Sequence, residues 1–378
     1  MKLEKIKFEK ELGWDKQLPT YMDSENTLII LFGSRENFDY VYPVEDLIRN
    51  FPTARIVGCS TSGIINNAVV YDSYLTAAII KFEQTEIRTV SASIEVEDES
   101  YVAGEAIAEA LNADDLQGVI VFSDGLMVNG SELVEGLRWV LKDKPVMTGG
   151  LAGDGNLFEK TWVVHNGLPQ QYQIAAVGFY GSHIRLNFAT QNGLDVFGIE
   201  RKVTRAIKNR LYELDGVPAL ELYKNYLGEL AADLPGSALR FPLSLRADDD
   251  SEHCIVRTIL NVSEADQSMI FAGDIPEGSF VQLMRANFER VIDGAAFAGE
   301  QIRSMVGDNP VLCLAISCVG RRMMLGERTE EEVESVFERL PKGSEQIGFY
   351  SYGEFSPSAR GRYDLHNQTM TLTTIHEE

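Results

Sequence analysis

Small residues gather where the apolar segments of this chain end, and this pattern constrains the fold more than any other feature of the sequence. Apolar runs lead directly into the glycine- and serine-rich segments 58–63, 123–125, 148–155 and 317–320. Glycine permits backbone conformations that are closed to other residues and lets another molecule approach the main chain. Backbone N–H groups left free at the end of a strand can bind a small polar solute. The pattern therefore predicts loops at strand ends that bind a small molecule.

Length and composition predict a folded protein of about two domains. The chain has 378 residues, of which 44% are hydrophobic and 24% charged. Its net charge of −23, without a cluster of Lys and Arg to offset it, disfavours nucleic acid as a partner. No apolar segment approaches the ~20 residues of a membrane span, and the charged N-terminal segment is unlike a signal peptide. The four cysteines form no Cys-x-x-Cys pair, so we expect a reducing, cytoplasmic location without membrane insertion.

The order of predicted elements favours an α/β (α+β) protein of two domains. Apolar runs such as 28–32 and 119–122 are typical of strands covered on both faces. Residues 132–141 have the pattern of a helix that Asn129 can cap. We expect each domain to contain a mixed, partly parallel sheet with covering helices. A strand that ends in Ser and Gly before a helix recurs in both halves, too weakly to establish a duplication. The expected boundaries are 25–190 for the first domain, 200–358 for the second and 359–378 for a C-terminal extension.

Motifs for the commonest cofactors are missing from the sequence. It contains neither the P-loop pattern nor the glycine spacing of a dinucleotide-binding fold. Its five histidines are dispersed and make none of the spacings of a zinc site. We therefore predict no cofactor and no metal.

Cys59 is the strongest single candidate for a reactive or ligand-binding residue. It follows a predicted strand among small polar residues, where free backbone N–H groups would lower the pKa of a thiol. A nucleophilic cysteine also needs a base, and no histidine lies near Cys59 in the sequence. Three interpretations stay open: a small residue that fills a tight turn, ligand binding through the neighbouring hydroxyls, or a catalytic thiol.

Charged candidates follow other predicted strands. Asp124 and Asp154 could bind a ligand ammonium, although turn formation is the simpler role of an Asp beside Gly. Arg321 could bind a carboxylate through two parallel hydrogen bonds, or be ion-paired within an acidic protein. Residues 349–354 offer aromatic walls and a carboxylate, or an aromatic core strand. Together these groups suit a zwitterion such as an amino acid, provided that they converge on one cleft.

The candidate ligand-binding residues lie at the end of a predicted strand or directly after it. None is assigned a catalytic role. They are Gly58, Cys59, Ser60, Thr61, Ser62, Ser123, Asp124, Gly149, Gly150, Asp154, Arg321, Arg322, Tyr350, Tyr352 and Glu354.

The same segments give the chain a resemblance to the FIST family. Seven motifs occur in the family's order and span roughly residues 25–358. The resemblance implies a FIST N domain followed by a FIST C domain, found in bacteria and elsewhere beside signalling modules. It also implies sensing of small ligands, with amino acids as the suggested class, and brings no catalytic residues with it. The motifs are segments 51–52 with 57–63, 122–125, 149–154, 212–219, 275–278, 317–322 and 348–354.

Three functions follow from these observations, and the first is the leading expectation. It is a cytoplasmic small-ligand sensor whose bound state is detected by a signalling partner protein, through domain closure or a change in one domain face. The second is a hydrolase or transferase that uses Cys59 or a serine as nucleophile. The third is a protein-binding scaffold without a small ligand. The sequence leaves open whether a site lies within one domain or between the two.

Overall fold

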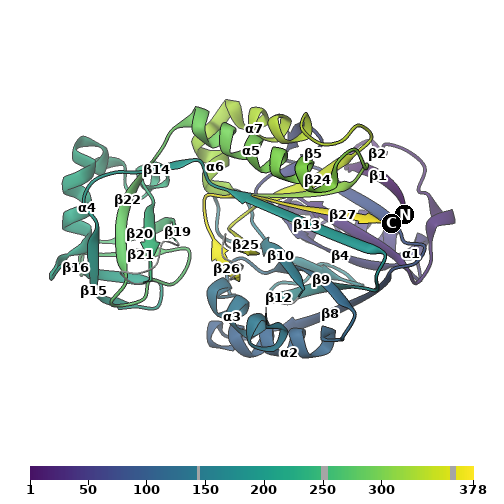
Figure 1. The fold of residues 1–378 in the computed structure, drawn as a ribbon, viewed down its shortest axis with the longest axis horizontal. Coiled ribbons are helices and arrows are strands. Elements are labelled where there is room, and N and C mark those ends of the chain that lie inside the picture. The colour runs from purple at the N-terminus through teal and green to yellow at the C-terminus, as the bar shows by residue number, and fades with distance from the viewer. Residues whose placement is uncertain (143–144, 248–253, 358–362) are drawn as a thin grey trace.

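The chain folds into a large body and a smaller lobe that projects from one end of it (Figure 1). The computed structural model describes residues 1–142, 145–247, 254–357 and 363–378. The lobe comprises residues 194–286, and its first and last strands pair with each other, so that both linkers to the body lie side by side. The helices of the described residues include none that is long and apolar enough to cross a membrane.

Three six-stranded sheets make up the body. The first has the order β11 (Val163–His165), β4 (Arg55–Ser60), β3 (Thr27–Gly33), β7 (Leu75–Lys81), β1 (Lys2–Glu9) and β2 (Gly13–Trp14). The second has the order β26 (Tyr363–His366), β25 (Gly353–Pro357), β10 (Val146–Leu151), β9 (Leu116–Ser123), β12 (Gln173–Tyr180) and β8 (Glu86–Ser93). The third has the order β13 (Ile184–Gln191), β27 (Met370–Glu377), β23 (Leu312–Cys318), β24 (Glu345–Ser351), β5 (Ile64–Asn66) and β6 (Val69–Tyr71).

The three sheets repeat one topology. Each has a central parallel pair, namely β3–β4, β9–β10 and β23–β24, and its remaining neighbours are antiparallel. In each sheet one more strand pairs with the first strand of the parallel pair, and this strand pairs in turn with the strand that begins that copy of the topology in the sequence. The resulting orders are β3–β7–β1, β9–β12–β8 and β23–β27–β13. The body is therefore a threefold repeat, and the lobe is an insertion after the first strand of the third copy.

The three copies are interlocked by exchanged strands. The segment that follows each second parallel strand leaves its own sheet and pairs with the corresponding strand of another copy. Thus β5 pairs with β24, β11 with β4, and β25 with β10. Because the exchange closes into a ring, the body is one folding unit that takes strands from both sequence halves. Of the expected C-terminal extension, residues 363–366 and 370–377 are strands of this body.

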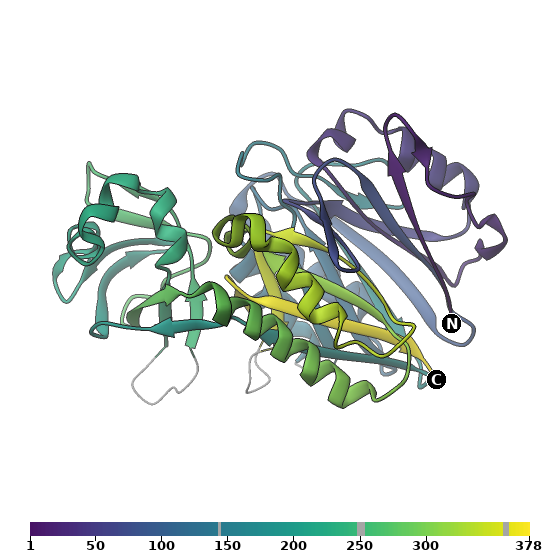
Figure 2. The ribbon, with the colours of Figure 1, turned by 90° about the horizontal axis from the view of Figure 1, so that it is seen from above.

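A shared core holds the sheets together. Their inner faces pack on one another, and Phe32, Phe122 and Phe349, one from each sheet, meet with ring centroids 4.8–6.1 Å apart. Helices cover the outer faces (Figures 1 and 2): α1 (Tyr42–Asn50) on the first sheet, α2 (Ser100–Leu111) and α3 (Gly130–Leu141) on the second, α5 (Phe288–Val306) and α7 (Thr329–Phe337) on the third. Strands buried on both faces explain the continuous apolar runs of the sequence.

The lobe has its own antiparallel sheet and its own apolar core. One helix, α4 (Ala219–Leu227), packs on this core. The strands of the lobe are β14 (Leu194–Val196), β15 (Arg201–Ile207), β16 (Arg210–Leu214), β17 (Val217–Pro218), β18 (Leu243–Arg246), β19 (Cys254–Arg257), β20 (Ile259–Ser263), β21 (Ser268–Phe271) and β22 (Phe280–Ala286).

The α/β class, the mixed sheets and the helix after Asn129 are confirmed. The prediction of loops at residues 58–60 and 149–151 is wrong, because β4 and β10 continue through them. The prediction of a loop at 317–320 is wrong too, because β23 runs to Cys318 and the helix α6 (Val319–Leu325) follows at once. Gly58, Gly149 and Gly348 occupy the same place in the three second parallel strands. A Cβ atom at these glycines would lie 1.9, 2.0 and 1.8 Å from the carbonyl oxygen of the facing strand. These glycines therefore permit close strand pairing in the core rather than approach of a solute.

Candidate ligand-binding cavity between body and lobe

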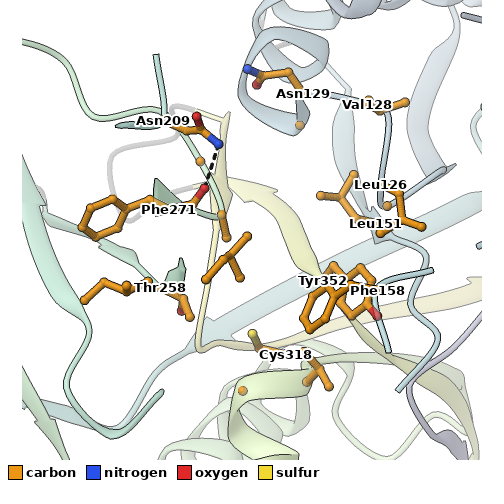
Figure 3. A pocket seen from close by; sticks show the side chains of 18 of the residues that line it. Leu126, Val128, Asn129, Leu151, Phe158, Asn209, Thr258, Phe271, Cys318 and Tyr352 are labelled. Atoms are coloured by element: carbon orange, nitrogen blue, oxygen red, sulfur yellow. Dashed lines mark hydrogen bonds between the residues drawn. The ribbon is translucent and has the colours of Figure 1, made fainter. Parts of the chain in front are cut away.

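A cavity of about 340 Å³ lies between the body and the lobe. Figure 3 shows Leu126, Leu151 and Tyr352 on the body side, Thr258 and Phe271 on the lobe side, with Cys318 below them. Small-molecule sites are typically such concave, mostly apolar spaces with a few polar groups. Most of the remaining lining residues come from the loop after β9, the start of α3, α6 (Val319–Leu325) and the lobe segments around residues 235–239 and 258–274, with Glu97, Phe158 and Asn209 from other segments.

Asp124 shapes the cavity wall that the body contributes. It is fully buried after β9, and its Oδ1 accepts hydrogen bonds from the backbone N–H groups of Leu126 (3.0 Å) and Met127 (2.7 Å). Its Oδ2 accepts a hydrogen bond from the hydroxyl of Thr161 at 2.6 Å. Asp124 therefore fixes the loop that lines the cavity, which is the turn-forming role that an Asp beside Gly favours.

Asn129 lines the cavity and joins the body to the lobe. Its Oδ1 caps α3 by accepting the N–H groups of Ser131 (3.0 Å) and Glu132 (3.1 Å). Its Nδ2 donates to the carboxylates of Asp274 in the lobe (3.2 Å) and Glu97 in the body (3.4 Å). Glu97 and Asp274 are the two charged residues among the described residues that line the cavity.

Thr258 is the polar side chain of the lobe wall that has no partner. It is 4% exposed, it lines the cavity, and its hydroxyl makes no hydrogen bond within the described part of the chain. An unsatisfied buried hydroxyl costs about 1–3 kcal/mol. The oxygen has almost no accessible surface, so the cost falls on the packing of the lobe wall.

Tyr352 and Phe158 form an aromatic wall on the body side. Their rings stack with centroids 4.5 Å apart, and the Tyr352 hydroxyl donates to the buried carboxylate of Asp154. Asp154 also accepts the backbone N–H groups of residues 158–160 at 2.8–2.9 Å. Burial alone would raise the pKa of Asp154, but these hydrogen bonds, that of Tyr352 first, bring it below its usual value. The ionised carboxylate therefore holds this wall in place.

Arg321 ties the cavity to the linkers of the lobe. It lies in α6, beside the lining residues Val319 and Gly320, but its own side chain is fully buried. Its Nε pairs with the equally buried Glu332 at 2.8 Å. Its remaining N–H groups donate to the carbonyl oxygens of Asn192 in the first linker and of Val291, at 2.8 Å, beyond the second. Arg321 is thus fully engaged within the protein.

Of the fifteen candidates from the sequence, Tyr352 is the one that lines this cavity. Cys59 is buried in β4, where burial raises the pKa of its thiol well above the usual value. The Ser60 hydroxyl accepts the N–H of Trp162 at 3.0 Å, and the Thr61 hydroxyl donates to the carbonyl of Gly63 at 2.6 Å. These groups, with Gly58, stabilise the strand crossing from the first sheet to the third.

The other candidates also have internal partners. Ser62 bonds through its hydroxyl to the N–H of Gly155 at 3.0 Å, and Arg322 donates to the carbonyl of Ser62 and to Asp72. The Tyr350 hydroxyl donates to Glu332 at 3.0 Å, and Gly149 and Gly150 lie within β10. Ser123 is buried, with its hydroxyl donating to the carbonyl of Asp124 at 3.1 Å.

Glu354 is a buried carboxyl two residues beyond the lining residue Tyr352. It accepts the hydroxyls of Ser351 and Thr369, the latter at 2.8 Å, and the N–H of Thr369 at 3.2 Å. Burial raises the pKa of Glu354 to about 8, against the opposing effect of these hydrogen bonds and of Arg321. Glu354 therefore helps to join β25 to the segment before β27.

Sequence reasoning missed the residues of the lobe wall. Thr258 lies in a segment without a glycine motif, but Phe271 and Asp274 flank Gly273, which ends the apolar run 269–272. The pattern of small residues at the ends of apolar runs could therefore have pointed to them, as could segment 275–278, which follows Asp274 directly. That these residues lie against the body is a tertiary feature. Asn129 was predicted as a helix cap, and the structure adds its contact with Asp274.

The fold and the cavity define an α/β protein with a solute-sized cleft beneath an inserted lobe. The chain belongs to the FIST family: the model of the FIST N domain matches residues 27–217, and that of the FIST C domain matches residues 219–357. The boundary between the two matches lies within the lobe. A similar chain is the uncharacterized protein MJ1623 of the archaeon Methanocaldococcus jannaschii, 25% identical over 93% of this chain and 73% of its own length. FIST domains are associated with sensing in signal transduction and are not a known enzyme class.

Proposed function

We propose that this protein is a cytoplasmic sensor that binds a small metabolite in the cavity between body and lobe. The observation that supports it most is the cavity itself, which is lined by residues of both the body and the lobe. Membership in a family of sensory domains supports the same role. An amino acid or a metabolite of similar size is the ligand class to test first.

The linkers provide a route from binding to a change of shape. A solute that contacts Val319 and Gly320 bears on α6, and Arg321 in the same helix holds the first linker and the first turn of α5 through backbone carbonyls. Binding shifts an equilibrium between lobe positions only if the solute prefers one of them. A solute that contacts both walls has that preference, because it loses one wall when the lobe moves away. A signalling partner would then detect the lobe position.

The enzyme alternative based on Cys59 has little support. A nucleophile must be accessible and, for a cysteine, ionised. Cys59 has no exposed surface, and its thiol pKa is raised by burial. Ser123, a serine candidate beside the cavity loop, is equally buried.

Thermal unfolding with a panel of metabolites tests the sensor proposal. A ligand at about 100 times its Kd adds about 2.7 kcal/mol to the stability of the folded state, which raises the Tm by several degrees. The matched variant is Ala272→Phe, because Ala272 lines the cavity and a larger side chain would fill it. We expect the panel to contain compounds that raise the Tm of the wild type and leave the variant unchanged. A panel without effect, or equal shifts in both proteins, would contradict the proposal.

A further inference from the structure

We infer that the cavity binds an uncharged, mainly apolar solute of the size of a phenylethyl group, in preference to the corresponding amino acid, amine or carboxylate. This inference rests on the proposed function, since it narrows the ligand class of the same cavity. The volume of about 340 Å³ lies at the small end of the usual range for small-molecule sites. Two independent sets of observations carry the inference: the apolar side chains of the walls, and the internal partners of the charged and polar groups around them.

Apolar side chains on the body side of the cavity remain open to solvent. Leu126, Phe158 and Met323 line the cavity, with 38%, 44% and 43% of their surfaces exposed, respectively. Leu151 and Tyr352, which are almost fully buried, lie beside Leu126 and Phe158 (Figure 3). The free energy gained by removing apolar surface from water grows with the area that is covered. These walls therefore favour a solute with an apolar body.

The lobe adds apolar residues from the other side. Leu239, Leu260 and Ala272 line the cavity there, and Leu260 is 40% exposed. On the body side, Met127 and Met323 have unbranched, flexible side chains that adapt to the shape of an apolar partner. A solute that fills the cavity would thus replace water on apolar groups of both units.

The two acidic lining residues lie near cations of the same chain. Burial lowers the pKa of Arg257 to about 10, and the charge of Asp274 opposes that shift. Asp98 raises the pKa of Lys208 through a hydrogen bond, and the charge of Glu97 adds to this effect. A solute ammonium would have to compete with these cations for the two carboxylates. The acids therefore give no net advantage to an amine or to the ammonium of an amino acid.

A ligand carboxylate would find no basic partner in the cavity. The described residues that line it include no Lys, Arg or His. Arg321, which the sequence predicts for this role, is fully buried and pairs with Glu332 at 2.8 Å. The amide of Asn129 is engaged as well, since its oxygen accepts two backbone N–H groups and its nitrogen donates to two carboxylates. Burial of a charge without a partner is costly, so a carboxylate would bind less tightly than a neutral group.

Isothermal titration calorimetry on the full chain, with four probes that share a phenylethyl body, tests this inference. The probes are 2-phenylethanol, phenethylamine, phenylalanine and 3-phenylpropionate, of which only the first carries no charge at pH 7. We expect 2-phenylethanol to bind at least about tenfold more tightly than each of the charged probes.

Two aromatic residues with the same backbone conformation provide matched variants. Phe158 lines the cavity and has a φ of +55°, whereas Tyr172, with a φ of +58° and 42% of its surface exposed, is not among the described lining residues. Glycine adopts this conformation without strain, so Phe158→Gly and Tyr172→Gly should both remain folded. We expect Phe158→Gly to weaken the binding of 2-phenylethanol at least about fivefold, because one wall is removed, and Tyr172→Gly to leave it unchanged.

The outcomes separate this inference from the proposed function. A charged probe that binds as tightly as 2-phenylethanol overturns the preference for an uncharged solute and leaves the cavity as a site. Equal affinity of Phe158→Gly and the wild type for 2-phenylethanol overturns the role of the apolar wall. Failure of all four probes overturns the ligand class, and contradicts the proposed function only if the metabolite panel also has no effect. The Tm of each variant without probe shows that it is folded, so a loss of binding reports on the wall.

Discussion

The buried Arg321–Glu332 pair gives the clearest test of how α6 holds the lobe. In Arg321→Met, Glu332 would remain buried with the hydroxyls of Ser317 and Tyr350 as its partners, at 2.7 and 3.0 Å. Removing one partner of a buried ion pair costs about 3–5 kcal/mol, because the other charge is left uncompensated. At about 2 °C per kcal/mol for a chain of this size, the Tm should fall by roughly 6–10 °C.

Urea unfolding, followed by the fluorescence of the buried Trp162, measures the loss in the body. The matched control is Arg322→Met, since Arg322 is the neighbouring arginine and pairs with the exposed carboxylate of Asp72. A solvent-exposed pair is worth about 0–1 kcal/mol, so the control should lose little stability. The double variant of Arg321→Met with Glu332→Met should recover much of the loss, because it removes both charges.

Two results would refute this reasoning. One is an Arg321→Met variant that is less than about 1 kcal/mol below the wild type, as for an exposed arginine. The other is a double variant that is as unstable as the two single losses combined, since uncoupled sites add. Either result would show that the Arg321–Glu332 pair does not stabilise the body as proposed.

Three further predictions concern residues that the sequence singled out. Gly149→Ala places a Cβ 2.0 Å from a carbonyl oxygen of the facing strand, so it should lower the free energy of unfolding in urea by at least about 3 kcal/mol. The control Gly167→Ala, whose Cβ would have its nearest atom at 3.7 Å, should change that free energy by less than about 1 kcal/mol. Equal effects of the two substitutions would contradict close strand packing as the role of Gly149. Burial raises the pKa of Glu354 to about 8 from an ordinary value of 4.5, so the folded state retains a proton that the unfolded chain releases, and this group makes stability fall as the pH rises from about 5 to 8. Glu354→Gln should flatten that slope, by up to about 1.4 kcal/mol per pH unit, and an unchanged slope would refute the assignment. In thiol labelling of the native protein, the exposed Cys254 should react first and Cys59 only on unfolding; rapid labelling of Cys59 would revive the nucleophile hypothesis.

The local elements could be predicted from the sequence because their signals are local. Apolar runs such as 28–32 gave strands that are buried on both faces, and Asn129 gave the start of α3. Asp124 and Asp154 followed the simpler of their two predicted roles, since each carboxylate accepts the backbone N–H groups of the loop after it. Each of these interactions joins residues that are close in the chain, so the spacing of residue types is enough to predict it.

The threefold body and its cavity could not be predicted in the same way. The exchanged strands pair residues that are far apart in the chain, as in Gly150 opposite Glu354. A glycine after an apolar run has the same appearance whether it admits a ligand or a neighbouring strand, and Gly58 and Gly149 do the second. Thr258 and Asp274 line the cavity because the lobe lies against the body, and no pattern in either sequence segment predicts that contact.

Crystals grown with the panel compound that raises the Tm most test the central claim most directly, because electron density locates the bound molecule. The account predicts density for it in the cavity between body and lobe, beside Tyr352 and Ala272. Saturable binding in solution combined with density at the strand crossing around residues 58–63, or on the outer surface of either unit, would contradict it.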